Sequence, residues 1–355
     1  MHSPLVSVII TNYNYSRFLK RCIDSIIGQS YSNIELIICD NGSTDESLSV
    51  ISEYLKIFPS KITLVRHRRN LGSANNFTSG ERLIQGDYFM NFGADDYLRP
   101  SFIETAVRIF SAFPRVSQII THADIVDDSD IISSRASFFD GSYVIPGMSY
   151  APILMMAGVT AHSSQTILST AAHFDLQNRN GYIYSSMIGE RTTAMMHATK
   201  YDVVYLSKPF VVCRESLNNE TAKLNASLSQ ILEQWSLINA FAQYASLNEY
   251  EEIFSRQNEA IVKLGELSSR LAADYYSQSN FEIAGRYLGL SMVLTGAFDN
   301  LLSNDTAFSE RMSATAEVFA ATCKLNSART QIRQHSYAAP EGSARLDIAT
   351  LKTYE

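Results

Sequence analysis

Hydrophobic positions in the first hundred residues follow two alternating patterns, short continuous apolar runs and longer amphipathic segments. The runs Val6–Ile10, Ile34–Cys39, Ile62–Val65 and Asp87–Phe92 are typical of strands buried on both faces. Between them, apolar residues recur every three or four positions, which predicts helices. Since strands joined by helical crossovers run parallel, the pattern predicts an α/β fold in which helices flank a mostly parallel sheet. The predicted helices of this part are Phe18–Ile27, Leu48–Phe58 and Ser73–Ile84.

The pattern changes twice further along the chain. Up to about Asn219 it is mixed, with strand-like pieces at Gln118–Thr121 and Val203–Leu206. After Ala222 it is helical only: one apolar stripe runs from Leu228 to Ala245, and a helical hairpin is predicted to turn near residues 277–280. We therefore expect a mixed α/β domain over residues 1–221, an all-helical module over 222–335 and a disordered polar tail over 336–355.

Composition narrows the class of protein. The chain has 355 residues and a formal net charge of -7, which argues against broad nucleic-acid binding, because such binding needs a basic face. Its four cysteines have no metal-binding spacing and indicate reduced thiols. We see no signal peptide, and the apolar stretches are too short to span a bilayer. We expect a cytoplasmic protein and leave open a peripheral contact with the inner face of the membrane.

The sharpest chemical signal is a pair of carboxylates, Asp95 and Asp96, which comes directly after an apolar strand. Paired hard oxygen ligands suit Mg²⁺ or Mn²⁺ and a diphosphate bridged by such a metal. The alternative is a turn in which Asp95 caps the following helix. In parallel sheets the ligand lies at the carboxyl ends of the strands, and this pair lies at such an end.

Two further clusters follow strands. Residues 40–45 read Asp-Asn-Gly-Ser-Thr-Asp, and Asp40 could accept hydrogen bonds from a base or a ribose. The same residues also fit a plain helix cap, with Ser43 or Thr44 at the N-cap. Residues 66–69 read Arg-His-Arg-Arg, which could face phosphates or form a solvated edge.

Taken in order, these segments resemble the glycosyltransferase family 2 catalytic domain, which has a GT-A fold. The resemblance is dense over residues 4–114, thinner to about residue 219 and absent beyond. The segments that carry it are VSVIITNYN (residues 6–14), QSY (29–31), IELIICDNGSTD (34–45), NLG (70–72) and GDYFMNFGADD (86–96).

The resemblance implies roles for single residues. Asp95 falls on the second carboxylate of the family's Asp-x-Asp motif and is the expected ligand of Mn²⁺ or Mg²⁺, whereas Gly93 stands where the first carboxylate is usual. Asp40 resembles the residue that reads a uracil-type base. The residues expected to contact the nucleotide-sugar are Thr11, Asn12, Tyr13, Asp40, Asp45, Asn70, Ala94 and Asp96.

The family's catalytic base is an acidic residue that precedes a helix and a strand, and Glu190 occupies that place. The alternative is that Glu190 is an exposed helix residue. The family's late basic or histidine position lies near Arg214, where this chain has no histidine, so a third protein ligand to the metal is left open.

The resemblance therefore implies an inverting glycosyltransferase that uses a UDP- or dTDP-sugar and a saccharide or lipid-linked acceptor, in bacterial surface polysaccharide (O-antigen or capsule) synthesis. One alternative is an inactive scaffold that binds sugar nucleotides. A sugar nucleotidyltransferase is less favoured, because no Gly-rich phosphate loop follows the first strand. The C-terminal helices could position the acceptor, bind a partner, form a homo-oligomer or simply complete the core.

Overall fold

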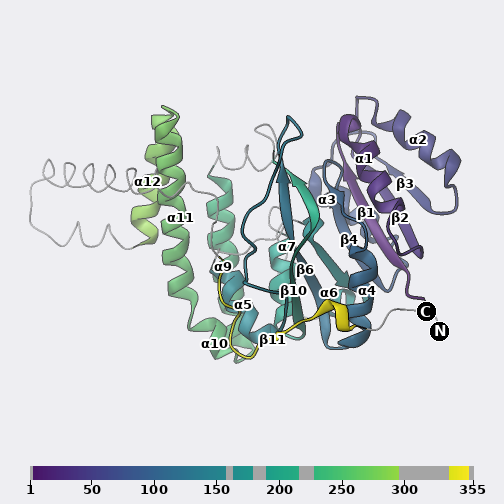
Figure 1. Ribbon diagram of the computed structural model, residues 1–355. Helices are drawn as coiled ribbons and strands as arrows, with labels where there is room; N and C mark the ends of the chain where they lie inside the picture. The colour runs from purple at the N-terminus through teal and green to yellow at the C-terminus, as the bar shows by residue number, and fades with distance from the viewer. Residues whose placement is uncertain (1–2, 157–162, 179–188, 216–227, 296–335, 352–355) are drawn as a thin grey trace, which may run out of the picture. The chain divides into compact units, whose positions relative to one another are not determined.

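The computed structural model describes residues 3–156, 163–178, 189–215, 228–295 and 336–351 (Figure 1). Its elements in chain order are β1 (Val6–Asn12), α1 (Ser16–Ile27), β2 (Ile34–Asp40), α2 (Ser47–Ile57), β3 (Ile62–Arg66), α3 (Ser73–Glu81), β4 (Tyr88–Gly93), β5 (Tyr97–Leu98), α4 (Phe102–Ala112), β6 (Val116–Val126), β7 (Ile132–Ser133), β8 (Tyr143–Ile145), α5 (Gly147–Met155), η1 (Ser163–Gln165), β9 (Thr166–Ser169), α6 (Thr170–Gln177), α7 (Gly189–Ala198), β10 (Asp202–Arg214), α9 (Ser229–Leu247), α10 (Glu251–Phe254), α11 (Gln257–Ser277), α12 (Phe281–Leu294), β11 (Ala344–Arg345) and η2 (Ile348–Thr350).

The strands form one 11-stranded mixed sheet in the order β11-β8-β10-β6-β9-β4-β1-β2-β3, with β5 paired to β10 and β7 paired to β6. Strands β4, β1, β2 and β3 run parallel, and β6 and β10 form a second parallel pair. Strand β9 lies antiparallel between β4 and β6 and so joins the two parallel groups. The expected α/β sheet is confirmed.

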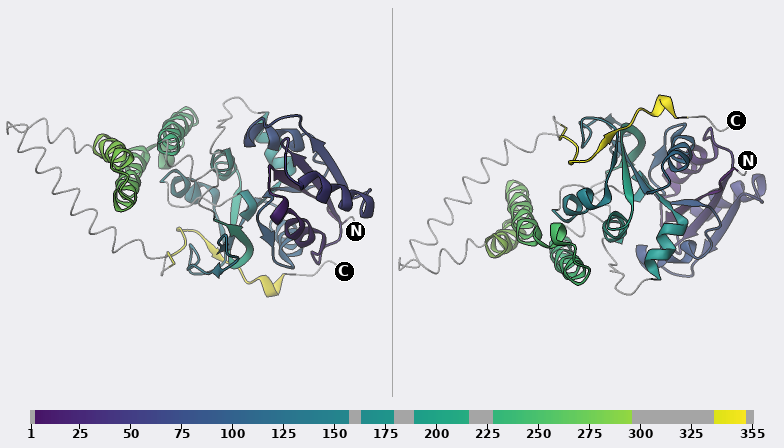
Figure 2. Two further views of the ribbon diagram at one scale, coloured as in Figure 1. Left: turned by 90° about the horizontal axis from the view of Figure 1, so that it is seen from above. Right: turned by 90° about the horizontal axis from the view of Figure 1, so that it is seen from below.

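Successive side chains of the central strands point to opposite faces of the sheet and pack into two different cores, as expected for strands buried on both faces. On one face, Val8 and Ile10 join a large core with the apolar sides of α1, α2 and α4. On the other face, Ile9 packs with Ile37, Phe89 and Phe77 of α3. The sheet therefore lies between two layers of helices (Figure 2).

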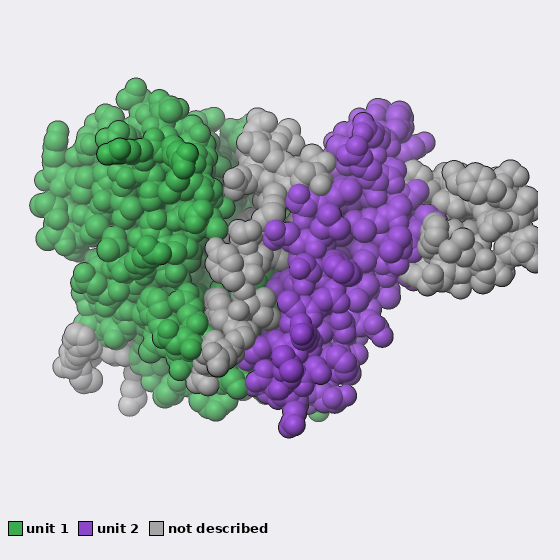
Figure 3. All heavy atoms as spheres, turned by 180° about the vertical axis from the view of Figure 1, so that it is seen from behind, with its two compact units in different colours: residues 1–151, 160–216, 335–355 green, residues 152–159, 217–334 purple. Residues whose placement is uncertain are grey.

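The chain divides into two compact units (Figure 3): residues 1–151, 160–216 and 335–355 form unit 1, and residues 152–159 and 217–334 form unit 2. The described part of unit 2 beyond residue 227 is helical, and α11 and α12 form the predicted hairpin, since the first ends at Ser277 and the second begins at Phe281. The expected boundaries at residues 221 and 335 lie outside the described residues, so the separate function of this module stays a prediction. None of the described helices is long and apolar enough to cross a bilayer.

The C-terminal segment differs from the disordered tail that its polarity suggested. Residues 336–351 return to unit 1, where β11 pairs antiparallel with β8. Leu346 is buried in the large core, with Ile348 and Leu351 packed against it, and Arg108 of α4 donates hydrogen bonds to the carbonyl oxygens of both latter residues. These three apolar side chains are too few to give a periodic pattern in the sequence. The segment is ordered because β11 pairs with the edge of β8.

A buried polar chain joins the helices on the second face of the sheet. Ser117 of β6 hydrogen-bonds His197 Nδ1 of α7 at 2.8 Å, and His197 Nε2 lies 3.5 Å from His173 Nδ1 of α6. His173 Nε2 in turn lies 2.8 Å from the carboxylate of Glu81 at the end of α3. Both imidazoles are almost fully buried, so each needs these partners to offset its lost hydration.

We expect these buried hydrogen-bonded histidines to make the fold sensitive to acid. Burial, followed by repulsion from His173, lowers the pKa of His197 well below 6.5 in the folded protein. The unfolded chain therefore binds a proton below pH 6.5 that the folded protein rejects, so the free energy of unfolding falls as the pH drops, by at most about 1.4 kcal/mol per pH unit.

Thermal melts between pH 8 and pH 5 measure this effect. The slope below pH 6.5 should flatten in His197→Gln and persist in the control His122→Gln, whose half-buried imidazole hydrogen-bonds the carbonyl oxygen of Arg135. Equal slopes in wild type and His197→Gln would show that acid acts elsewhere.

Candidate active site

Polar loops meet at one edge of the sheet because three neighbouring parallel strands end there. Asn12 of β1 pairs with Asp40 of β2, and Thr11 pairs with Gly93 of β4. The loops that follow these strands therefore share one edge, which is where ligands bind in open parallel sheets. The structure thus brings the residues expected after β1, after β2 and in the Asp95–Asp96 segment to one place.

Asp40 organises the loop after β2. Its carboxylate is fully buried, with Oδ1 accepting from Asn12 Nδ2 at 2.9 Å and Oδ2 accepting from the backbone N–H of Ser43 at 3.0 Å. Asn12 Nδ2 also donates to Ser43 Oγ at 3.1 Å, while its own Oδ1 is buried with no hydrogen-bond partner among the described residues. Hence an unused acceptor lies next to Asp40, and the base-reading role of Asp40 stays a prediction.

Asp45 fixes the starts of two helices at once. Its Oδ2 accepts from the N–H of Ser16 in α1 at 2.9 Å, and its Oδ1 accepts from the N–H of Ser47 in α2 at 3.0 Å. Burial acts to raise the pKa of Asp45, but the hydrogen bonds from Ser47 and Ser16 outweigh it and lower the pKa. The residue of this loop that caps the helices is therefore Asp45, rather than Ser43 or Thr44. The contact of Asp45 with the nucleotide-sugar stays a prediction.

The loop after β3 is tied to the loop after β2. Asn41 Nδ2 donates to Asn70 Oδ1 at 2.8 Å, and the N–H of Leu71 donates back to Asn41 Oδ1 at 2.9 Å. Gly42 has a φ of 75°, and a Cβ atom there would lie 2.8 Å from the backbone of Arg69, so only glycine fits. Asn70 and the basic run thus border the site, with three of the four basic side chains, Arg66, Arg68 and Arg69, exposed.

The acidic pair encloses the glycine that replaces the first carboxylate of the family motif. A Cβ atom on Gly93 would lie 3.0 Å from Asp95 Oδ1 and 3.1 Å from Asp96 Oδ2. The two oxygens therefore converge on the place that a side chain at residue 93 would fill. Two carboxylate oxygens around one point are the kind of donor set that hard divalent cations take, and the residues present fit Mn²⁺ or Mg²⁺ in this respect.

Asp96 is held from behind by the end of β10. Its Oδ1 accepts from the backbone N–H of Arg214 at 2.8 Å, and the side chain is almost fully buried. Burial raises the pKa of Asp96 to about 6, although hydrogen bonds from Ser164 and Arg214 act to lower it. Among the described residues no group of three or more His, Cys, Asp or Glu side chains could hold a metal ion, so water and the substrate would complete the coordination.

For the remaining predicted residues, Tyr13, Ala94 and Glu190, the structure gives their place in the fold and fewer contacts. Tyr13 is 40% exposed just past β1, whereas Ala94 is buried between Gly93 and the acidic pair. Glu190 belongs to the first turn of α7, but its side chain lies outside the described residues. The next residue, Arg191, is buried, and burial lowers the pKa of its guanidinium to about 10.

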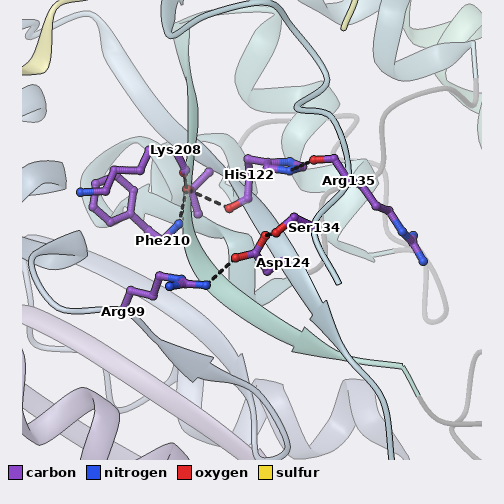
Figure 4. Close-up of polar contacts among 8 residues, drawn as sticks. Arg99, His122, Asp124, Ser134, Arg135, Lys208 and Phe210 are labelled. Carbon is purple, nitrogen blue, oxygen red and sulfur yellow. Dashed lines mark hydrogen bonds and ion pairs between the residues drawn. The ribbon is translucent and has the colours of Figure 1, made fainter. Parts of the chain in front are cut away.

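Sequence reasoning missed a second polar cluster, on β6 and β10 (Figure 4). Asp124 is buried, accepting a hydrogen bond from Ser134 Oγ at 2.7 Å and forming an ion pair with Arg99. Thr121 Oγ1 donates to the carbonyl oxygen of Lys208 at 2.8 Å. The signal was present, because a charged residue inside the apolar segment of β6 must find a partner to be buried.

The comparisons with known proteins agree with this geometry. Residues 7–158 match the family model described as Glycosyl transferase family 2. Over 132 residues the chain is 36% identical to the uncharacterized glycosyltransferase alr2836 of Nostoc sp. (strain PCC 7120 / SAG 25.82 / UTEX 2576). That match covers 37% of this chain and 40% of the relative, so the chain spans well under half of the length of that relative.

Two solved structures share the fold over most of the chain. One is S. aureus TarS 1-349 in complex with UDP-GlcNAc, with a TM-score of 0.50 and 15% identity over 83% of this chain and 92% of that one. The other is the mannosyltransferase PcManGT from Pyrobaculum calidifontis in complex with GDP-Man and Mn²⁺, with a TM-score of 0.50 and 15% identity over 93% and 89%. At these identities the likeness establishes the GT-A fold alone.

Proposed function

Because residues 7–158 match the family model described as Glycosyl transferase family 2, we propose that this chain moves a sugar from a nucleoside diphosphate donor to an acceptor hydroxyl with inversion at the anomeric carbon. The observation that carries the proposal is that the loops after β1, β2 and β4 share one edge of the sheet, where oxygens of Asp95 and Asp96 converge beside Gly93. An anionic diphosphate and a divalent cation together suit an edge of the sheet that offers two carboxylate oxygens.

The proposed mechanism uses Asp95 and Asp96 at this edge together with Glu190 of α7. Asp95 and Asp96 would hold Mn²⁺ or Mg²⁺, which neutralises charge on the departing diphosphate when bound. Glu190 accepts the proton of the acceptor hydroxyl, whose oxygen forms a bond to the anomeric carbon while the bond from that carbon to the diphosphate breaks. The loop stapled by Asp40 and Asp45 holds the nucleoside, and the residues proposed to contact the donor are Thr11, Asn12, Tyr13, Asp40, Asp45, Asn70, Ala94 and Asp96.

A panel of nucleotide-sugars tests this function. Incubated with Mn²⁺ and no acceptor, the protein should slowly release nucleoside diphosphate from one donor, and release should stop when the metal is chelated. A second candidate is a protein that binds sugar nucleotides without turnover, which Gly93 in place of a carboxylate favours. Tight donor binding with no release at any metal concentration would establish that candidate instead.

We further propose that the donor carries uracil or thymine. Both bases present an N3–H donor, which cytosine lacks, and the buried edge near Asp40 and Asn12 offers two acceptors for it: the Asp40 carboxylate and the unpaired Asn12 Oδ1. The TarS structure contains a uridine nucleotide and the PcManGT structure a guanosine nucleotide, so the shared fold leaves this choice to the side chains.

Calorimetry with UDP, dTDP, CDP and GDP measures this choice. Binding of UDP or dTDP should exceed that of CDP in wild type, and the ratio should fall toward one in Asp40→Asn. Because Asp40 also organises the loop, the variant should lose some affinity for every nucleotide, and the ratio is the decisive quantity. An unchanged ratio with uniformly weaker binding would assign Asp40 to loop structure only.

We propose an acceptor in a bacterial surface polysaccharide on the resemblance alone, and a location in the cytoplasm or at the inner face of the membrane on the same ground. The helices of unit 2 are proposed to position that acceptor or a second copy of the chain.

A further inference from the structure

Three arginines meet beside the acidic pair, and we call them the arginine cluster: Arg17 and Arg21 of α1 with Arg214 of β10. Arg17 and Arg21 are four residues apart and so share one face of the helix. The guanidinium carbons of Arg17 and Arg214 lie 5.0 and 4.0 Å from the centre of the Phe18 ring, and that of Arg21 lies 3.7 Å from the centre of the Tyr97 ring. Two aromatic rings thus hold three cations near one another.

Buried donors at this place have no acceptor. The Tyr97 hydroxyl and Arg214 Nε are both buried and lack a hydrogen-bond partner among the described residues. Tyr97 is 9% exposed, and the charges that act on its hydroxyl come from Arg21, Arg99, Arg214 and Asp130. Buried N–H and O–H groups without partners are rare in folded proteins and call for a ligand that accepts hydrogen bonds. An oxyanion is such a ligand.

An internal carboxylate covers part of the cluster. Asp130 stands on the hairpin between β6 and β7, and its Oδ1 lies 2.6 Å from Arg214 Nη2. The same hairpin offers backbone oxygens, since Asp127 O accepts from Arg214 Nη1 and Asp128 O accepts from Arg17 Nη2 at 3.3 Å. The bond from Arg214 is the main cause that lowers the pKa of Asp130, so this carboxylate stays ionised near its guanidinium.

Beyond the pairing of β6 with β7, the hairpin tip over residues 127–132 is exposed. Ile131 and Ile132 are 65% and 46% exposed, so the tip is not fixed by core packing. Asp127 Oδ1 accepts from the N–H groups of Ser129 and Ile131, which keeps that carboxylate within its own turn. Asp130 has a φ of 61°, in the left-handed region that aspartate adopts more readily than most residues other than glycine. The tip can therefore leave the arginine cluster without disrupting core packing.

We propose that the arginine cluster and the Tyr97 hydroxyl bind a phosphate group of the substrate, and that the Asp130 carboxylate fills this place when the substrate is absent. Phosphate fits better than a carboxylate, because three guanidinium groups and a hydroxyl offer more donors than two oxygens can accept. The backbone of Arg214 holds Asp96, so this site adjoins the acidic pair. The inference rests on the proposed function for the source of the phosphate, which is either the donor diphosphate or a phosphate carried by the acceptor.

Calorimetry with inorganic phosphate and with pyrophosphate, in the absence of metal and nucleotide, tests the site. Asp130→Asn removes the internal competitor and should bind either anion about five- to tenfold more tightly than wild type. Arg21→Gln, a change at an exposed residue, should weaken binding in both backgrounds. The charge-matched control Asp140→Asn, whose carboxylate accepts a hydrogen bond from the Tyr143 hydroxyl, should bind as wild type does.

Competition then separates the two sources of phosphate. If the occupant is the donor diphosphate, saturating UDP with Mn²⁺ should displace glycerol 3-phosphate from Asp130→Asn; if it is a phosphate on the acceptor, both should bind together. Equal anion affinity in wild type, Asp130→Asn and Arg21→Gln would overturn the proposal and leave the hairpin contacts as purely structural. These measurements need no turnover, so they can fail while donor hydrolysis succeeds, and the reverse.

Discussion

Replacing Asp95 by asparagine is expected to reduce metal-dependent turnover by about 100-fold or more while leaving the fold intact, because the change removes the charge of the expected metal ligand. A neutral amide oxygen is a weaker ligand for Mn²⁺ than a carboxylate. Asp95 Oδ1 is one of the two oxygens that converge beside Gly93, and the other is Asp96 Oδ2. Because Asp96 Oδ1 already accepts from the N–H of Arg214, the variant would keep a single carboxylate oxygen at this point.

Donor hydrolysis measured over a range of Mn²⁺ concentrations checks this result. Asp87→Asn is the matched control, because Asp87 precedes the same strand and its Oδ2 accepts from the N–H of Leu5 at the opposite end of β4. That variant should keep its turnover. Wild-type turnover in Asp95→Asn at limiting Mn²⁺ would remove Asp95 from the metal site and point to Asp96 alone.

The sequence predicts the β1–β4 half of the sheet well because its strands are continuous apolar runs that need no distant partner to be recognised. Strands β6 and β10 are longer than their patterns suggested. In β6 the apolar run ends at Thr121, yet the strand continues to Val126 because Arg99 and Ser134 satisfy the buried Asp124. Such partners are distant in sequence, so local periodicity cannot reveal them.

Strand β10 shows a different limit. Pro209 has no N–H and interrupts the ladder, and the register with β6 shifts on both sides of it. The predicted piece therefore stopped at Leu206, although Phe210 to Cys213 resume the strand and are buried. A parallel neighbour on one side stabilises the second half in spite of the break.

At the site, the sequence predicts which residue types are present, but not how deeply each is buried or which partners it bonds. An acidic residue at the end of β2 suggests a group open to a ligand, yet Asp40 is fully buried and holds Asn12 and Ser43. That role depends on the close register of β1 and β2, which only the assembled sheet provides. The arginine cluster was missed for a related reason, since Arg214 is nearly 200 residues from its neighbours on α1.

The second large effect is expected at Glu190. Glu190→Gln keeps the size of the side chain but cannot accept a proton, so transfer to the acceptor should fall by about 10²- to 10⁴-fold, the usual contribution of a general base. Binding of the donor should be unchanged. Glu190 lies in the first turn of α7, and the later turns of that helix are fixed in unit 1 by His197 and its bond to Ser117, so the change should not disturb the fold.

The pH dependence of the transfer rate separates a base from a helix residue. In wild type the rate should fall on the acid side as the carboxylate of Glu190 is protonated, and this limb should disappear in Glu190→Gln. Glu190→Asp should restore part of the rate, because the carboxylate is retained one methylene further from the acceptor. The control Glu215→Gln breaks only an ion pair with Arg135 and should behave as wild type. If Glu190→Gln transfers sugar at the wild-type rate, the proton leaves by another route and Glu190 is an ordinary residue of the helix.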